Sequence, residues 1–186
     1  CSGDFYQNAN GGPTSGDINP NFYEFDADLE WDSRVTIGCI DSTGNPYPEN
    51  NLQNIGINWT NFENGDDLSA TDNGIWFHLP TDPAGDAMMY TNSDCVQEQG
   101  VLLARLTVLG QDSEVGFSAL VQGRDTNDVV FQQEVETYFG YSSMEDCNGN
   151  FVADACDIAN GTSVDANGNG IPDECDDSCP GDADGN

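Results

Sequence analysis

The chain has 186 residues, of which 37% are hydrophobic, so it is long enough for one packed domain and an additional segment. It carries 34 acidic residues against three arginines and no lysine, and the net charge of −31 excludes binding to the phosphates of nucleic acids or to anionic membrane surfaces. No stretch is apolar enough to span a membrane, and seven cysteines without zinc-type spacing indicate disulfides in an extracellular or cell-surface setting.

Residues 1–20 are rich in Gly, Asn, Ser and Pro, which predicts a loop or a loosely held N-terminal arm. The chain opens at Cys1 without an initiator Met, so we expect a processed, mature form. Cys1 and the small residues after it resemble the start of mature bacterial lipoproteins, in which this cysteine carries lipid. The alternative is an ordinary disulfide cysteine near a trimmed terminus.

Residues 21–143 are expected to form one all-β domain. In 23–39 the odd positions are mostly apolar, whereas the even positions from Glu24 to Asp32 are acidic. This alternation predicts a long strand with one apolar face, bent near Asp28 or Ser33. We interpret the acidic row as a solvated strand face, and the alternative is an added calcium or partner site, because carboxylates are ligands of hard divalent cations.

Five further runs with alternating or continuous apolar residues predict additional strands, and turn signals separate them. Strands without intervening helices predict a β-sandwich, Ig-like or jelly-roll-like. Cys39 and Cys95 are the only cysteines of this domain and are therefore its expected disulfide. The further predicted strands lie at 55–59, 75–79, 101–109, 115–121 and 129–135.

Residues 144–186 form a separate acidic tail, in which a 12-residue pattern occurs twice, starting at Asp146 and, 19 residues later, at Asp165. Each copy places side-chain oxygens at loop positions 1, 3, 5, 9 and 12, and position 7 offers a backbone carbonyl. Calcium takes six to eight oxygens at roughly 2.3–2.6 Å, and this spacing lets alternate residues of a tight loop face one ion. The predicted ligands are Asp146, Asn148, Asn150, Val152, Asp154 and Asp157 in the first loop and Asp165, Asn167, Asn169, Ile171, Asp173 and Asp176 in the second.

The pattern D-x-N-x-N-G-x-x-D-x-C-D resembles the calcium repeats of thrombospondin type 3 arrays and dockerin-like tails of secreted bacterial proteins. The resemblance covers about 40 residues and implies calcium at these EF-hand-type loops. The first copy departs from it, because Phe151 replaces the glycine at position 6. Asp at position 12, in place of a bidentate Glu, indicates an affinity in the extracellular range, on the order of 10⁻⁴ to 10⁻³ M.

A third copy begins with Asp182, Asp184 and Asn186, and its remaining ligands would come from a longer chain or from another molecule. The alternative for the whole segment is a disordered acidic tail, which would not require duplicated spacing. Without metal or disulfides, so acidic a segment cannot bury enough apolar surface to fold.

The cysteines of the tail allow more than one pairing. Loop positions 2 and 11 approach each other when positions 1 and 12 share a metal, which favours Cys147–Cys156 and leaves Cys175 for Cys179. A Cys156–Cys175 link between the two copies is the main competitor. Asn58 and Asn160 match the N-glycan acceptor tripeptide.

No phosphate-binding loop, no G-x-S-x-G motif and no second histidine accompany His78, whose surroundings read as strand, so we expect no enzyme. The expected function is a calcium-stabilised extracellular structural protein, a subunit of a cell-surface or filament assembly formed with itself or with other surface proteins. The alternative is a carbohydrate- or protein-binding module with a dockerin-like docking tail, in which Trp31, Trp59 or Trp76 would recognise glycans.

Overall fold

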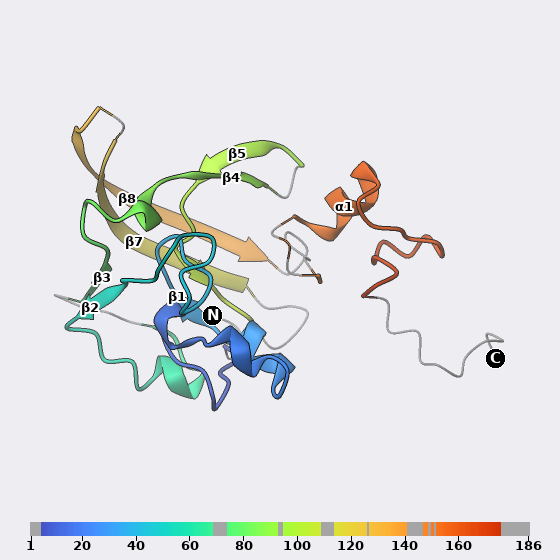
Figure 1. Cartoon of the computed structure of the whole chain (residues 1–186), viewed down its shortest axis with the longest axis horizontal. Helices are drawn as coiled ribbons and strands as arrows, with labels where there is room; N and C mark the ends of the chain where they lie inside the picture. The colour runs from blue at the N-terminus through green and yellow to red at the C-terminus, as the bar shows by residue number, and fades with distance from the viewer. Residues whose placement is uncertain are drawn as a thin grey trace. The chain divides into compact units, whose positions relative to one another are not determined.

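The computed structural model describes residues 5–68, 74–92, 95–108, 114–125, 127–140, 147–148, 150 and 152–175. Over these residues the chain consists mainly of short strands, irregular segments and 3-10 turns, with a single α-helix (Figure 1). It divides into two compact units. The first unit is Cys1–Met88 with Val101–Gly140, and the second is Met89–Gly100 with Tyr141–Asn186.

The described strands pair two by two, as β1–β6, β2–β3, β4–β5 and β7–β8. The prediction of a strand-rich chain is confirmed, whereas the β-sandwich stays a prediction. The strands are β1 (Arg34–Val35), β2 (Gln53–Ile55), β3 (Ile75–Phe77), β4 (Met88–Thr91), β5 (Gln97–Gly100), β6 (Ala104–Arg105), β7 (Glu114–Arg124) and β8 (Val130–Gly140). The helices are the 3-10 turns η1 (Ser15–Asp17), η2 (Pro20–Phe22), η3 (Ala27–Trp31), η4 (Phe62–Asn64) and η5 (Pro83–Gly85), and α1 (Asp154–Asn160).

The long strand predicted at 23–39 is wrong. Its middle forms η3, and only Arg34–Val35 pair as a strand. Phe25 is 84% exposed whereas Leu29 is fully buried, so the apolar odd positions do not share one face. The acidic row is therefore not a strand face, and one of its members, Asp32, is itself fully buried.

Asp32 is buried because the N-terminal segment wraps around its carboxylate. Its Oδ1 accepts the backbone N–H of Asn8 at 2.6 Å and its Oδ2 accepts that of Gly12 at 3.0 Å. A Cβ on Gly11 would stand 2.0 Å from Oδ2, so only glycine fits at this close approach. Burial raises the pKa of Asp32 above its ordinary value, although these hydrogen bonds oppose the shift.

The segment expected to be a loose arm supplies core residues of the first unit. Phe5 is buried and packs edge-on against Phe62, with ring centroids 5.6 Å apart, and Val115 completes this cluster. Phe5 also bridges to Val108, and Ile18 is fully buried. Burial of such large side chains, worth about 1.5–3 kcal/mol each, ties residues 5–18 to the rest of the unit.

Arg34 is buried without a carboxylate partner at hydrogen-bond distance among the described residues. Its Nε donates to the carbonyl of Ile40 at 3.1 Å, and its Nη1 donates to those of Glu30 and Asp32 at 3.0 and 2.8 Å. Burial lowers its pKa to about 10, so the guanidinium stays charged at neutral pH. Its three hydrogen bonds to backbone carbonyls stabilise the bend between residues 30 and 40.

The longest elements are β7 and β8, which form an antiparallel hairpin in register from Glu114↔Gly140 to Arg124↔Val130. The strands predicted at 115–121 and 129–135 are confirmed. An aromatic ring covers a glycine directly across this hairpin at two places. A Cβ on Gly116 would lie 3.1 Å from the Tyr138 ring, and one on Gly123 would lie 2.8 Å from the Phe131 ring.

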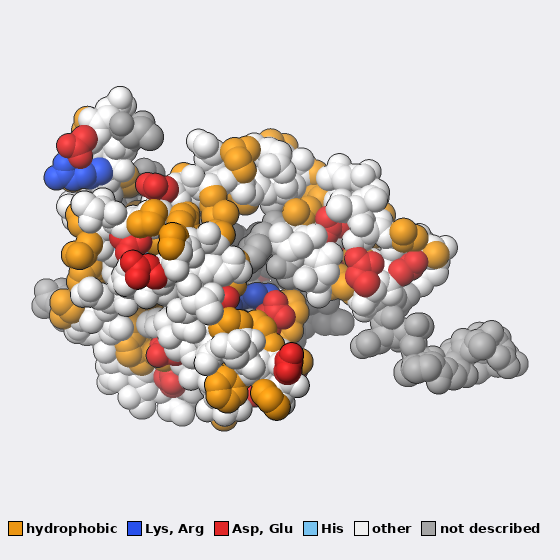
Figure 2. Space-filling model, in the orientation of Figure 1, with side chains coloured by type: hydrophobic (Ala, Val, Ile, Leu, Met, Phe, Trp, Pro, Cys, Tyr) orange, Lys and Arg blue, Asp and Glu red, His pale blue; other side chains and the backbone are white. Residues whose placement is uncertain are grey.

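The hairpin also exposes apolar side chains to solvent. Leu120 is 60% exposed and Tyr138 is 73% exposed. Figure 2 shows that hydrophobic side chains reach the surface at many places on the face in view, interspersed with acidic ones.

The second unit is held by two disulfides, Cys95–Cys156 and Cys147–Cys175, whereas Cys39 of the first unit is a buried free thiol. The predicted pairs Cys39–Cys95, Cys147–Cys156 and Cys175–Cys179 are therefore wrong, as is the competitor Cys156–Cys175. The reason is that the segment Met89–Gly100 belongs to the second unit, so Cys95 lies with Cys156 of α1 and not with Cys39. Cys1 and Cys179 lie outside the described residues.

Candidate metal centre

The two predicted loops share one framework of hydrogen bonds. At position 2 of each loop a backbone N–H donates to the Oδ1 atom of the aspartate at position 9. The distance is 2.9 Å both for Cys147 to Asp154 and for Ala166 to Asp173. This pairing fixes the two aspartates against the start of their loops.

The asparagines at positions 3 and 5 repeat the same geometry in both copies. Each side-chain Oδ1 accepts the backbone N–H two residues later, which curls the backbone inward as a calcium loop requires. The bonds are Asn150 N to Asn148 Oδ1 (3.0 Å) and Val152 N to Asn150 Oδ1 (2.7 Å) in the first loop, and Asn169 N to Asn167 Oδ1 (2.9 Å) and Ile171 N to Asn169 Oδ1 (2.8 Å) in the second.

Asp165, at position 1, accepts three hydrogen bonds from the backbone of the second loop. Its Oδ1 accepts the N–H groups of Gly168 at 2.7 Å and Asn169 at 3.2 Å, and its Oδ2 accepts that of Gly170 at 2.9 Å. Gly170, at position 6, has φ +86°, the left-handed conformation that glycine adopts without strain. This is the sharp turn that the sequence pattern places there.

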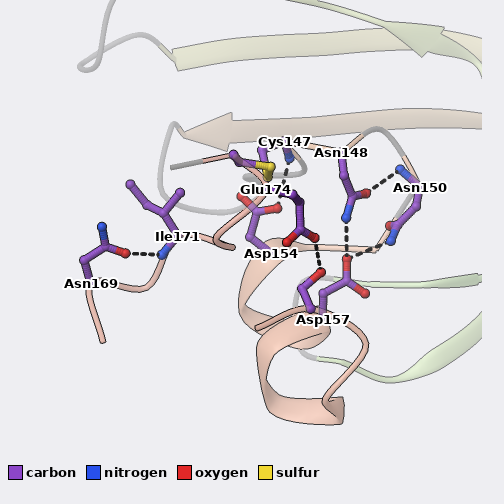
Figure 3. The surroundings of a disulfide bond; sticks show 10 residues. Cys147, Asn148, Asn150, Asp154, Asp157, Asn169, Ile171 and Glu174 are labelled. Atoms are coloured by element: carbon purple, nitrogen blue, oxygen red, sulfur yellow. Dashed lines mark hydrogen bonds between the residues drawn. A yellow bond between two sulfur atoms is a disulfide. The ribbon is translucent and has the colours of Figure 1, made fainter. Parts of the chain in front are cut away.

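The first loop buries two carboxylates. Asp154 is 3% exposed and Asp157 is 1% exposed. The Oδ2 of Asp157, at position 12, accepts the side-chain amides of Asn148 at 3.2 Å and Asn150 at 2.7 Å, so positions 3, 5 and 12 converge (Figure 3). The sequence of the second unit contains no Lys, Arg or His, so no basic side chain of its own compensates these two charges.

The two loops are also joined to each other. The Cys147–Cys175 disulfide links position 2 of the first loop to position 11 of the second. Glu174 accepts a hydrogen bond from Ser163, which lowers the pKa of Glu174. The sequence pattern did not single out Glu174, because the equivalent residue of the first copy is Ala155.

Five predicted ligands, Asp146, Asp176, Asp182, Asp184 and Asn186, lie outside the described residues. Within the described part of the chain, no three His, Cys, Asp or Glu side chains form a cluster that could hold a metal ion. The predicted ligands that are described include side-chain oxygens of asparagines and the backbone carbonyls of Val152 and Ile171. Neutral oxygens of this kind suit calcium.

Comparisons with known proteins identify no relative: no family model, curated protein or solved structure matches the chain. Among the described residues, no helix has the length and apolar character needed to cross a bilayer.

The two predicted glycan acceptors, Asn58 and Asn160, are both exposed, and Asn58 Oδ1 accepts the N–H of Thr60 at 3.1 Å.

The side chains considered for sugar binding or catalysis all have structural contacts. Trp76 donates from Nε1 to the carbonyl of Thr36 at 3.1 Å, and Trp59 donates to Asn54 at 3.2 Å. Arg105 lies over the ring of Trp31, 4.5 Å from its centroid. His78 Nδ1 lies 3.2 Å from a carboxylate oxygen of Asp82, and His78 is almost completely buried.

Proposed function

We propose that the second unit binds calcium through its two loops and that calcium stabilises a secreted, non-enzymatic structural protein. The observation that carries this proposal is the burial of Asp154 and Asp157 in a unit without a basic residue. A buried carboxylate costs several kcal/mol unless a cation or sufficient hydrogen bonds compensate it. A bound divalent cation would supply that charge.

The donor set favours calcium over other metals. The cysteines near the first loop, Cys147 and Cys156, are both in disulfides, and the sequence of the second unit contains no histidine. Among the described residues of this loop, the thiolate and imidazole ligands typical of zinc sites are therefore missing. Carboxylate, amide and backbone oxygens remain. Magnesium demands near-ideal octahedral geometry, whereas calcium accepts irregular sets of oxygens.

Calcium titration of the EDTA-treated full chain tests the proposal. We expect two binding sites in the millimolar to submillimolar range, and the double variant Asp154→Asn with Asp157→Asn should lose one of them. A matched control, Asp66→Asn with Asp86→Asn, removes the same charge from exposed positions of the first unit and should retain both sites. Calorimetry that detects no binding to the native chain up to several millimolar calcium would overturn the proposal.

We also propose that the chain is a subunit of a surface or filament assembly. The exposed apolar side chains of the β7–β8 hairpin support this, because large exposed apolar groups often mark interaction surfaces. Self-repulsion at a net charge of −31 opposes association, and calcium would reduce it. Light scattering and electron microscopy in millimolar calcium should reveal oligomers or filaments, and a monomer under all conditions would contradict the assembly.

A further inference from the structure

Two adjacent dipeptides of the second loop, Asn167-Gly168 and Asn169-Gly170, are of the type most prone to deamidation. In this reaction the glycine nitrogen attacks Cγ of the asparagine, and the bond from Cγ to the side-chain nitrogen breaks. Ammonia leaves with the proton from the glycine nitrogen, and a succinimide ring forms. Water then opens the ring to aspartate or isoaspartate, so no other reagent is needed.

In the structure, the two glycine nitrogens that would attack both donate hydrogen bonds to the same side chain, that of Asp165. Asp165 Oδ1 accepts the N–H of Gly168 at 2.7 Å, and Oδ2 accepts that of Gly170 at 2.9 Å. To react, each nitrogen must move toward Cγ of the preceding asparagine, and this movement requires its N–H to leave the Asp165 carboxylate. We propose that Asp165 protects Asn167 and Asn169 from deamidation, and that these two exposed asparagines are modification sites once Asp165 releases the loop.

The protection differs in kind from that at other Asn-Gly dipeptides of the described chain. The nitrogens of Gly11, Gly65 and Gly161 donate to backbone carbonyls, at 3.0, 2.9 and 3.2 Å. Only at the second loop do side-chain oxygens accept these protons, among the dipeptides that are described. A single substitution can therefore remove the protection without changing a backbone acceptor.

Deamidation at this place would alter the loop itself. Conversion to aspartate adds a carboxylate at position 3 or 5, and conversion to isoaspartate inserts a methylene group into the backbone. The inference rests on the hydrogen bonds of Asp165 and not on metal binding, and its test is made in EDTA so that its failure and the failure of the proposed calcium binding can be told apart.

The test is peptide mapping by mass spectrometry of the full chain, incubated at neutral pH and 37 °C with EDTA present. Asp165→Ala should raise the deamidation rates of Asn167 and Asn169 by roughly threefold to tenfold, the factor corresponding to one net hydrogen bond. Asn64, whose following nitrogen donates to the carbonyl of Phe62, is the internal control and should keep its rate in every variant.

A second variant distinguishes protection by Asp165 from general loosening of the loop. Asp165→Asn retains one acceptor oxygen, which should remain with Gly168 and Asn169, so Asn169 should accelerate more than Asn167. Mapping without reduction checks that Cys147–Cys175 is intact in each variant. Equal rates in the native chain and Asp165→Ala would overturn the proposal, as would equal acceleration of both asparagines in Asp165→Asn.

Discussion

Asp32 shows how one side chain determines the path of a distant segment. Its two carboxylate oxygens accept the backbone N–H groups of Asn8 and Gly12. The N-terminal segment therefore covers the carboxylate, which is fully buried. Because burial raises its pKa, the folded protein binds a proton at Asp32 more tightly than the unfolded chain does. Its contribution to stability is therefore fully present below the ordinary value of 3.8 and is lost as the pH rises through the folded value.

We predict that Asp32→Asn changes the pH dependence of stability in a defined direction. The variant lacks the titrating group, so relative to it the native chain should lose free energy of unfolding as the pH rises from about 4 toward neutrality. At every pH, the free energy of unfolding of the variant should also be lower by about 1–3 kcal/mol, because the N–H of either Asn8 or Gly12 loses its carboxylate acceptor. Urea unfolding at several pH values measures both effects, and a native chain that gains relative stability with rising pH would contradict the first.

A second prediction concerns Cys39, a fully buried thiol whose pKa is raised to about 11, chiefly by desolvation. Because the thiolate is the reactive form, this cysteine should resist alkylation by iodoacetamide at pH 8 in the folded chain. It should react in urea. Peptide mapping of alkylated samples measures this, and rapid labelling of Cys39 in the native state would show that it is accessible.

At the scale of elements, the turns between strands depend on particular glycines. Gly38 has φ +72°, and a Cβ there would stand 2.0 Å from the carbonyl oxygen of Ala84. Gly85, at the end of η5, has nothing within 4 Å of a Cβ position. The two glycines belong to the same unit and therefore form a matched pair.

We predict that Gly38→Ala destabilises the first unit by more than about 2 kcal/mol, since the left-handed conformation alone costs about 1–2 kcal/mol and the clash adds to it. Gly85→Ala should be neutral, or stabilising by up to about 1 kcal/mol, because alanine restricts the unfolded chain. Thermal unfolding of the two variants compares them directly. Similar melting temperatures would contradict the role assigned to Gly38.

Alternation of apolar residues predicted β3, β7 and β8, because apolar side chains recur at alternate positions along most of each strand. The same signal failed at 23–39, where the buried side chains include the charged residues Asp32 and Arg34. Asp32 is fixed by the distant backbone of Asn8 and Gly12, and Arg34 is fixed by nearby backbone carbonyls. β5 was missed because Gln97–Gly100 carries no apolar side chain, and β4 was missed because Met88–Thr91 shows no alternation of apolar and polar residues. Pairing partners for such strands depend on tertiary contacts that a local pattern does not contain.

The candidate loops could be predicted from sequence because their expected ligands lie close together in the chain, at a repeated spacing. The hydrogen bonds of Asp154 and Asp173 follow the same local rule in both copies. The disulfides could not be predicted in this way, since Cys95 reaches Cys156 only through the fold of the β4–β5 segment. The burial of Asp157 likewise depends on packing and carries no sequence signal.

For the whole molecule, the dominant property is a charge of −31. Carboxylates repel one another in the compact state, and salt shortens the range of this repulsion to about 10 Å at 0.1 M. Stability should therefore rise with sodium chloride. Calcium chloride at equal ionic strength should raise it further, because specific binding adds to screening.

This comparison can be made by thermal unfolding of the native chain and of the variant Asp154→Asn with Asp157→Asn. The native chain should gain several degrees more in calcium chloride than in sodium chloride, and the variant should lose much of that difference. If the two salts stabilised the native chain equally at equal ionic strength, screening alone would account for the effect.

The Cys95–Cys156 bond joins residues 61 positions apart, and the whole β7–β8 hairpin lies between them. A chain that emerges from the ribosome or a translocon exposes Cys95 long before its partner exists. In the sequence, Cys1 and Cys39 precede Cys95, and Cys147 also precedes Cys156. Burial of Cys39 as the first unit folds would remove its thiol from competition, and Cys95 would then stay available for Cys156.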